Sequence, residues 1–240
     1  MSDSSRLAKL AFSAKPTGIQ LGYFHLTNAQ AAQIDSALNE DIVSAAYASA
    51  ISYAEAVAGL SKNQIAWSIV RLYYTAFYCL RTITFLNKVV PFNAKSEYLL
   101  DLSTNSFLLG GASSHRWNWK SFAKITALRN KWPYSIDSEN AYNQLRQYRE
   151  DINYRRNFPD PELHQCLVTN ESDISRRIRI YRDDVAFFYT YLDSHLAVSY
   201  PTKLIYYVEQ EVSNRRLELS PERAKHLKSI WPIRDRCPLT

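Results

Sequence analysis

Glycine is scarce in this chain, and its few copies do not form a phosphate-binding loop. The five glycines are Gly18, Gly22, Gly59, Gly110 and Gly111. None belongs to a GxGxxG or GxxxxGK sequence, in which glycines let the backbone come close to a phosphate group. The sequence therefore excludes a phosphate-binding loop of either type, and with it nucleotide hydrolysis by a P-loop.

Cysteine and histidine are also few, and their spacing fits neither a disulfide framework nor a metal site. The three cysteines lack CxxC spacing, and the five histidines are far apart with no HExxH sequence. Cys79 falls in an apolar helical segment, where a buried thiol acts as a small hydrophobic side chain. We expect no metal, no other cofactor and a reducing, cytoplasmic environment.

Long apolar runs are absent as well. No segment reaches the roughly 20 uninterrupted apolar residues that a membrane-spanning helix needs. The N-terminal segment lacks the apolar core and the small-residue cleavage site of a secretory signal. We therefore expect a soluble, cytoplasmic protein without a membrane partner.

The chain does contain enough apolar material for a core, with a modest excess of positive charge. Its 240 residues are 46% hydrophobic, which suits one large domain or a domain with a sizeable extension. Lys and Arg number 29 against 23 Asp and Glu, so the formal net charge is +6 and an anionic partner is permitted without being required. Most of the 17 tyrosines fall at helical spacing, which places them in the core or at its rim.

Apolar residues recur every three to four positions in the first third of the chain, which predicts amphipathic helices. One helix should span residues 28–58 and end at Gly59. Ser61 begins the sequence SKNQ, a capping box that should open a second helix ending near Asn87.

The same periodicity returns in the second half of the chain. Asp137 should cap a helix over residues 138–157. A long helix should follow at about residues 172–198, and Pro201 can start another. Ser220 followed by Pro221 marks the start of a last helix, because proline is favoured at the first helical position.

The remaining segments do not suggest a sheet. Residues 1–27 are interpreted as an arm or short strands, and residues 88–113 as an irregular connection with one short helix. No segment alternates apolar and polar residues strongly enough to predict a strand. We therefore expect an all-α fold.

Two of the predicted helices carry narrow stripes of polar residues. The first stripe consists of Ser68, Arg71, Thr75, Tyr78 and Thr82. The second consists of Arg146, Arg149, Asn153 and Arg156. A buried arginine is costly unless its guanidinium is paired. Arg71 should therefore meet either a carboxylate or carbonyls inside the fold, or an anionic ligand in a cleft.

Residues 115–132, HRWNWKSFAKITALRNKW, form the most one-sidedly basic segment. Ser114 can cap a helix here, and its charged residues are all basic: Arg116, Lys120, Lys124, Arg129 and Lys131. Basic residues beside tryptophans can hold a nucleic-acid backbone and stack on bases. A face of this kind can equally be a solvated surface without a ligand.

Three segments together resemble the HEPN superfamily of helical-bundle proteins, especially its short members encoded beside minimal nucleotidyltransferases. SIVRLYYTAFYCLRTITFLN is similar to the family helix with a Tyr-Tyr-Ala-x-Phe core, here with Thr75 interposed. SHRWNWKSFAKI is similar to the family's Ser-His-basic segment that leads into a Phe. LRQYREDINYRRN is similar to its Arg-x-x-small-(Asp/Asn)-Tyr helix, here with Arg149, Asn153 and Tyr154.

The resemblance covers roughly residues 30–195 and implies an antiparallel helical bundle. The expected organisation is an N-terminal arm at residues 1–27, a HEPN-like bundle at residues 28–198 and a C-terminal helical extension at residues 199–240. The resemblance also implies a prokaryotic toxin-antitoxin, abortive-infection or antiviral protein that acts on RNA or binds it.

Catalytic HEPN proteins are metal-independent ribonucleases that use an Arg, the polar residue after it and a His. The matching residues are Arg156, Asn157 and His164. An arginine can hold the scissile phosphate, while a histidine of near-neutral pKa moves a proton at the ribose oxygens. The other candidate RNA-binding residues are Arg71, His115, Arg116, Lys120, Lys124, Arg149, Asn153, Tyr154 and Arg155.

This chain departs from the family motif in its spacing. Seven residues separate Arg156 from His164, which is longer than the family's spacing, and Pro159 and Pro161 interrupt a helix between them. We therefore expect a degenerate ribonuclease site.

Other functions stay open at this point. The fold could serve as a non-catalytic interaction module or a regulatory subunit of a defence complex. A small nucleotide could also bind at the Arg71 stripe. The expected partners are RNA and either a second copy of the chain, as a homodimer, or a partner defence protein.

Overall fold

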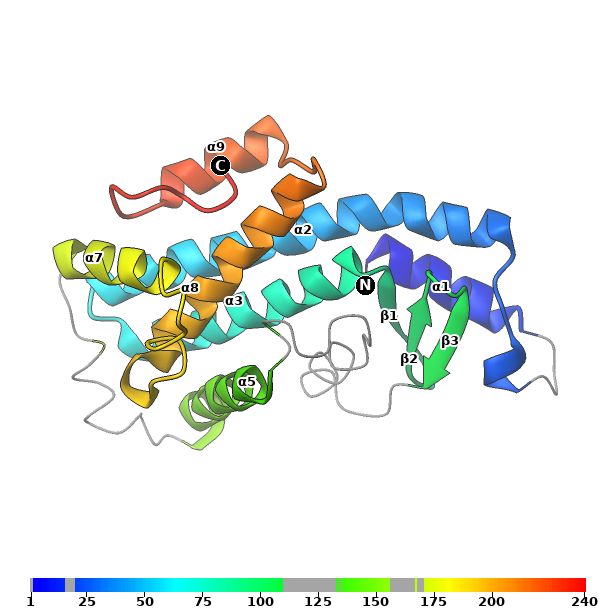
Figure 1. The fold of residues 1–240 in the computed structure, drawn as a ribbon, viewed down its shortest axis with the longest axis horizontal. Coiled ribbons are helices and arrows are strands. Elements are labelled where there is room, and N and C mark those ends of the chain that lie inside the picture. The colour runs from blue at the N-terminus through cyan, green and yellow to red at the C-terminus, as the bar shows by residue number, and fades with distance from the viewer. Residues whose placement is uncertain (1, 16–19, 110–132, 134, 156–166, 168–170) are drawn as a thin grey trace. The chain divides into compact units, whose positions relative to one another are not determined.

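The computed structural model describes residues 2–15, 20–109, 133, 135–155, 167 and 171–240, and it is mostly helical (Figure 1). The chain divides into two compact units, Met1–Ala45 with Leu80–Arg129, and Ala46–Cys79 with Asn130–Thr240. Helices α2 (Asn28–Ser61) and α3 (Ile65–Leu86) supply residues to both units. This division differs from the three segments predicted from the sequence.

The first unit contains a small antiparallel sheet, so the all-α prediction is correct only in its mostly helical character. Strands β1 (Val89–Ala94), β2 (Ser96–Asp101) and β3 (Ser106–Leu109) pair in sequence order. The expected irregular connection with one short helix at residues 88–113 is therefore wrong over the described residues 88–109.

The sequence does not reveal this sheet, because the turn between β1 and β2 lacks the glycine or asparagine that usually marks a hairpin. Lys95, between β1 and β2, has a φ of 69°, a conformation usually given to glycine or asparagine. Pro91 argued against a strand, but it lies on β1, an edge strand, where the missing N–H removes no hydrogen bond from the centre of the sheet.

Helix α1 (Asp3–Ser13) packs against this sheet, so 11 of the residues 1–27, expected to form an arm or short strands, are a helix. The Asp41 carboxylate accepts hydrogen bonds from the backbone N–H groups of Ser4 (2.8 Å) and Asp3 (3.2 Å) at the helix start. The Ser5 hydroxyl donates to the Pro91 carbonyl over 2.6 Å. These bonds join α1 to both α2 and β1.

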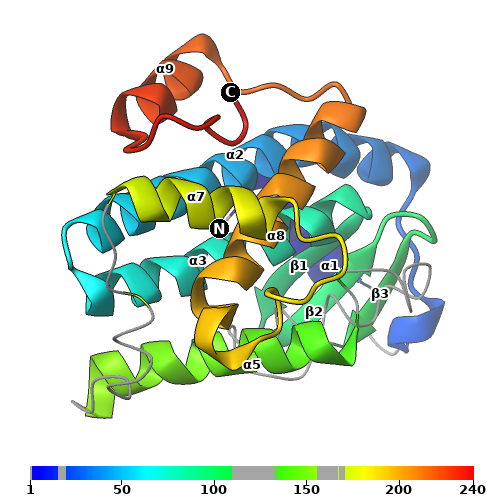
Figure 2. The same cartoon turned by 60° about the vertical axis from the view of Figure 1, so that its left-hand side comes forward.

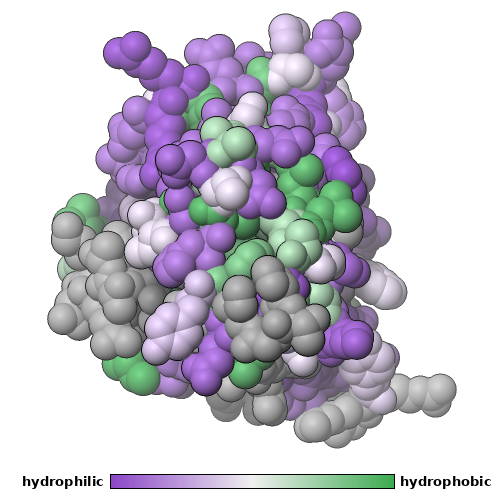
Figure 3. Space-filling model, turned by 90° about the vertical axis from the view of Figure 1, so that its right-hand side faces the viewer, coloured by the Kyte–Doolittle hydropathy of each residue, from purple (hydrophilic) through white to green (hydrophobic). Residues whose placement is uncertain are grey.

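Aromatic rings fill the space between α1 and the sheet. The Phe12 ring centroid lies 4.4 Å from that of Tyr98 and 5.5 Å from those of Phe92 and Phe107. Figure 3 shows a face at this end, largely hydrophilic, with a group of hydrophobic side chains near its middle. The large hydrophobic residues that stay exposed in this unit are Leu10, Tyr23, Leu108 and Leu109.

The second unit is helical, and its core is rich in tyrosine. In addition to the adjoining parts of α2 and α3 it contains α5 (Ile136–Glu150), the π-helical turn η3 (Asp151–Arg155), α7 (Glu171–Arg182), α8 (Asp193–Asn214) and α9 (Pro221–Ile230). Helix α8 lies between α7 and α5 (Figure 2). Cys79 is fully buried here, and burial raises the pKa of its thiol, so its predicted role as a small core residue is confirmed.

The connection between α2 and α3 differs from the predicted capping box. Helix α2 continues past Gly59 to Ser61, whose hydroxyl donates to the Ala58 carbonyl. Asn63, with a φ of 58°, then closes a Schellman motif in which Gln64 N–H bonds to the Gly59 carbonyl (2.8 Å). The absence of a side chain at Gly59 matters for packing, because a Cβ there would overlap the Ser68 hydroxyl of α3.

The predicted helix at residues 172–198 is two helices separated by a loop at residues 183–192. The Asp184 carboxylate shapes this loop by accepting hydrogen bonds from the N–H groups of Phe188, Tyr189 and Thr190, at 2.9–3.0 Å, and from the Thr190 hydroxyl. Pro201 does not start a helix but lies inside α8, so the predicted domain limit at residue 198 also falls within α8.

The N-terminal caps of α9 and α5 show where the predicted helix starts are correct. Ser220 caps α9, with Pro221 at its first position, as predicted. Helix α5 starts earlier than predicted, because the Ser135 hydroxyl, rather than the Asp137 carboxylate, accepts from the Ser138 N–H.

Gly59→Ala should destabilise the protein in the wild-type background only. The new Cβ would meet the Ser68 hydroxyl, and overpacking of this kind costs about 1–3 kcal/mol. In a Ser68→Ala background the next atom, the residue-68 Cβ, is 3.6 Å away, so alanine's helix propensity should give up to about 1 kcal/mol of stabilisation. Urea denaturation of the four proteins measures both effects. An equal loss of stability in both backgrounds would contradict the proposed contact.

Asp184→Ala should destabilise the protein by about 2–4 kcal/mol, because it leaves three backbone N–H groups and a hydroxyl in the loop without their acceptor. Asp183→Ala is the matched control. It removes an exposed ion pair with Arg182 and should cost less than about 1 kcal/mol. Urea denaturation with equal losses for the two variants would refute the role assigned to Asp184.

Candidate nucleic-acid interface at the end of helix α5

Helix α5 is fixed against α3 by a buried face that includes Tyr142 and Leu145. The hydroxyls of Tyr142 and Tyr73, on α3, lie 3.3 Å apart in the core. Arg149 follows Tyr142 by seven residues, which is two helical turns, and so lies over the same side of α5. The apolar packing of α5 therefore directs Arg149 toward α3.

Three tyrosine rings surround the Arg149 guanidinium. Its central carbon lies 6.0 Å from the Tyr73 ring centroid, 5.9 Å from that of Tyr74 and 5.4 Å from that of Tyr154. At these distances each ring face attracts the cation. The Nη2 group donates a hydrogen bond of 3.2 Å to the Tyr74 hydroxyl, which fixes the orientation of the guanidinium.

The guanidinium keeps unused hydrogen-bonding capacity. The Nε atom of Arg149 is buried and has no hydrogen-bond partner, and the Nε atom of Arg146 is in the same state. Arg146 binds Glu150 through Nη1 at 3.1 Å, whereas Arg149 has no carboxylate partner among the described residues. A partly buried cation held by aromatic rings and a neutral hydroxyl is suited to an external anion, because no described carboxylate neutralises its charge.

The charge of this site does not depend on pH in the physiological range. Burial alone lowers the pKa of Arg149, but the Tyr74 hydrogen bond and the neighbouring tyrosines raise it above its ordinary value. Burial raises the pKa of Tyr73 to about 12, so this hydroxyl stays protonated.

The helix changes geometry immediately after Arg149. Helix α5 ends at Glu150 and continues as the π-helical turn η3, where the Gln147 side-chain amide donates to the Asp151 carboxylate over 3.0 Å. Isolated π turns inside helices are rare and occur often at functional sites. Asn153 and Tyr154 on η3 are exposed, and Tyr154 keeps 71% of its surface accessible while its ring faces Arg149.

The predicted site residues fall into three groups. Arg149 and Tyr154 are in contact, with Asn153 on the same turn and the backbone of Arg155 ending it. Arg71 instead pairs with Glu55 of α2, through a carboxylate contact of 3.4 Å and a carbonyl hydrogen bond of 3.3 Å. Of the two alternatives that the sequence left open for Arg71, the structure therefore shows the internal pair and not a cation facing a ligand in a cleft. The remaining predicted residues lie outside the described part of the chain: His115, Arg116, Lys120, Lys124, Arg156, Asn157 and His164.

The sequence did not identify Tyr73 and Tyr74 as site residues. Tyr73 is buried and Tyr74 half-buried, in agreement with the expectation that tyrosines form the core or its rim. Their second role, as ring and hydroxyl contacts of Arg149, depends on a long-range contact between α3 and α5. The only sequence signal was that both tyrosines belong to one of the three segments of the HEPN resemblance.

Tyr74→Phe should destabilise the protein by about 0.5–1.5 kcal/mol, because it removes the hydroxyl that accepts from Arg149 and keeps the ring. Tyr154→Phe is the control, since this hydroxyl makes no hydrogen bond with a described residue and the ring contact is retained. Its free energy of unfolding in urea should equal that of the wild type. No difference between the two variants would contradict the importance of the Tyr74 hydrogen bond.

Across the described ranges, no cluster of three or more His, Cys, Asp or Glu side chains could hold a metal ion. No helix in the same ranges has both the length and the apolar character required to cross a membrane. Comparison with known proteins found no matching family model and no similar curated protein or solved structure.

Proposed function

We propose that this chain is an RNA-binding, HEPN-like component of a prokaryotic toxin-antitoxin or antiviral defence system, with a degenerate ribonuclease site. The observation that carries the proposal is the Arg149 guanidinium, which three tyrosines orient just before a π turn and which has no carboxylate partner in the described part of the chain. This arrangement lies on the helix that leads directly into Arg156 and Asn157.

The chemistry of the site fits a phosphodiester backbone. A guanidinium presents several donors in one plane and can bind two phosphate oxygens at once. The exposed Tyr154 ring, beside that guanidinium, offers a surface on which an unpaired base can stack. The exposed Asn153 side chain lies on the same turn and adds a donor and an acceptor.

Binding and cleavage make different demands on this site. Binding would use Arg149, and the contacts of its guanidinium with Tyr74 and Tyr154 support this part of the proposal. Cleavage requires a proton donor or acceptor at the ribose, and His164 is separated from Arg156 by a long, proline-containing segment. We therefore propose RNA binding by this surface, with a second copy of the chain or a partner protein completing the cleft.

The wild-type protein should bind tRNA or total RNA with an affinity that falls steeply with salt, and should leave the RNA intact in EDTA. Arg149→Ala should weaken binding by about tenfold, which corresponds to about 1.4 kcal/mol. Arg215→Gln, which removes one positive charge from an exposed position at the end of α8, is the control and should bind like the wild type.

Fluorescence anisotropy and gel analysis on the same samples separate the two parts of the proposal. The absence of binding, or equal binding by wild type and Arg149→Ala, would refute the RNA interface. RNA cleavage in EDTA that is abolished in His164→Ala would instead show an intact ribonuclease site and contradict only its degeneracy.

A second candidate function, a non-catalytic interaction module, is supported by the loop at residues 183–192. Its backbone is held by Asp184, yet it exposes Val185 (83% accessible) and Phe188 (66%). Apolar side chains displayed on a fixed loop are typical of protein contact sites. Purification with a stoichiometric partner protein, without salt-dependent RNA retention, would favour this function over RNA binding.

A further inference from the structure

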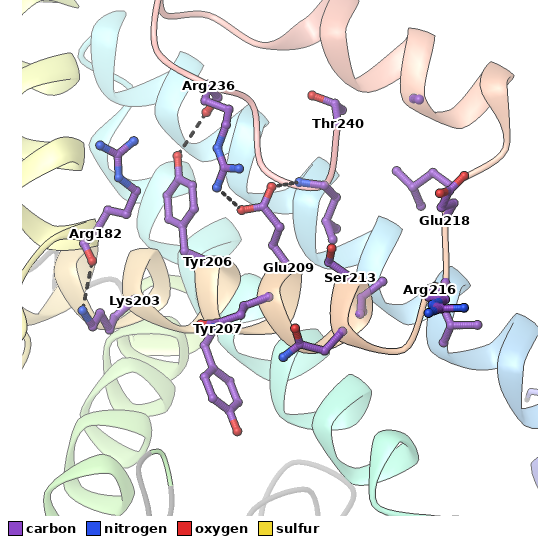
Figure 4. Close-up of a pocket in the computed structure, with 17 residues that line it drawn as sticks. Arg182, Lys203, Tyr206, Tyr207, Glu209, Ser213, Arg216, Glu218, Arg236 and Thr240 are labelled. Atoms are coloured by element: carbon purple, nitrogen blue, oxygen red, sulfur yellow. Dashed lines mark hydrogen bonds and ion pairs between the residues drawn. The ribbon is translucent and has the colours of Figure 1, made fainter.

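A cavity of about 810 Å³ lies beside α8 in the second unit, away from the Arg149 site in sequence and built from different residues. Helix α8 forms one wall, and α9 with the C-terminal residues 236–240 forms another (Figure 4). We call this cavity the α8 groove. Its volume is within the range of known ligand-binding pockets.

The α8 groove is long rather than round. Its lining residues on α8 begin at Lys203 and reach Asn214, a rise of about 16 Å at 1.5 Å per residue, and the lining continues to Leu219 beyond the helix. An extended polypeptide advances about 3.3 Å per residue, so roughly five residues would span the helical part. This length suits an extended chain better than a compact metabolite.

The α8 groove has a basic residue at each end, and the exposed carboxylate of Glu218 also belongs to its lining. In Figure 4 Lys203 lies at one end and Arg216 at the other. The Lys203 ammonium donates to the Arg182 carbonyl over 2.9 Å, and Arg216 is exposed with no ion pair to a described residue. The other two lining cations are neutralised within the fold, since Arg182 binds Asp183 and Asp235, and Arg236 binds Glu209.

The backbone at Arg216 is held in a conformation that normally favours glycine. Helix α8 ends in a Schellman motif, with Leu217 N–H bonded to the Val212 carbonyl at 3.1 Å and Arg216 N–H to that of Ser213 at 2.9 Å. Arg216 occupies the left-handed position with a φ of 57°. An arginine there costs about 1 kcal/mol relative to glycine, so glycine is a substitution that the backbone accepts.

The uncharged lining favours a peptide over a nucleic acid. Single-stranded nucleic acids bind through exposed aromatic faces. Tyr206 is only 8% accessible, with the guanidinium carbons of Arg182 and Arg236 at 5.6 and 5.8 Å from its ring centroid, and Tyr207, which also lines the groove, is half-buried. The groove instead has aliphatic side chains from Val212, Leu217 and Leu219, and the exposed carboxamides of Gln210 and Asn214.

We propose that the α8 groove binds an extended acidic segment of a partner protein. A carboxylate of this segment pairs with Arg216, and its aliphatic side chains pack against the apolar residues between α8 and α9. The carboxamides of Gln210 and Asn214 hydrogen-bond to its backbone, because each offers a donor and an acceptor. This proposal does not depend on RNA binding at Arg149.

Selection from a displayed library of random dodecapeptides on the immobilised full chain tests the proposal. Sequences that combine Asp or Glu with aliphatic residues should be enriched. The most enriched peptide, labelled with fluorescein, is then titrated against the wild type, Arg216→Gly and Arg215→Gln by anisotropy. Arg216→Gly should weaken binding about fivefold while the protein becomes no less stable, because glycine suits the left-handed position. Arg215→Gln should bind like the wild type.

The other outcomes overturn the proposal. They are a failure to enrich any peptide, enrichment of basic peptides, and an equal loss of affinity in Arg216→Gly and Arg215→Gln. Displacement of the labelled peptide by a ten-residue oligo(dT) strand, lost in Arg216→Gly, would assign the α8 groove to nucleic acid instead. Because Arg149→Ala leaves this groove unchanged, its effect on RNA binding is measured independently of the peptide experiment.

Discussion

The second unit depends on hydrogen bonds of tyrosine hydroxyls, because a buried phenol hydroxyl without a partner is costly. Five such hydroxyls find a partner on another segment, whereas that of the buried Tyr200 has none among the described residues. Tyr53 of α2 meets Thr202 of α8 at 2.7 Å, and Tyr73 of α3 meets Tyr142 of α5 at 3.3 Å. The same holds for three further hydroxyls, those of Tyr181 with His195, Tyr191 with Ser138 and Tyr206 with the Arg236 carbonyl. Tyrosine therefore supplies both the bulk of the core and the geometric restraints between helices.

The Arg149 site is an extension of this pattern to the surface. Tyr74 is the residue after the buried Tyr73, and its hydroxyl finds a guanidinium instead of another hydroxyl. The Arg149 guanidinium is partly buried and bonded to the neutral Tyr74 hydroxyl, so it is oriented but keeps its charge. The α8 groove shows the opposite arrangement, because Arg182 and Arg236 both have carboxylate partners there. Two basic surfaces of one chain thus differ in how their charge is held.

The sequence predicted α2 and α3 well, because apolar residues recur there over many turns, and it predicted the start of α9 from Ser220 and Pro221. It did not predict how the helices and strands are joined. With few glycines, the chain places other residues at positive φ, among them Asn63, Lys95 and Arg216, so the usual turn signals are missing. The break after α7 was hidden for a related reason, since one carboxylate, Asp184, replaces the helical hydrogen bonds. At the candidate site, Arg149 and Tyr154 could be found from a local pattern, whereas Tyr74 required a contact between residues 75 positions apart.

In the loop between α7 and α8, the residues that fix the backbone are not the residues that form its exposed apolar surface. All its interactions with the Asp184 carboxylate come from backbone N–H groups and the Thr190 hydroxyl. Backbone donors are the same whatever side chain follows them, so Val185 and Phe188 contribute nothing to this network through their own side chains. Substitution at these two positions should therefore change the chemistry of the exposed surface while the loop keeps its shape.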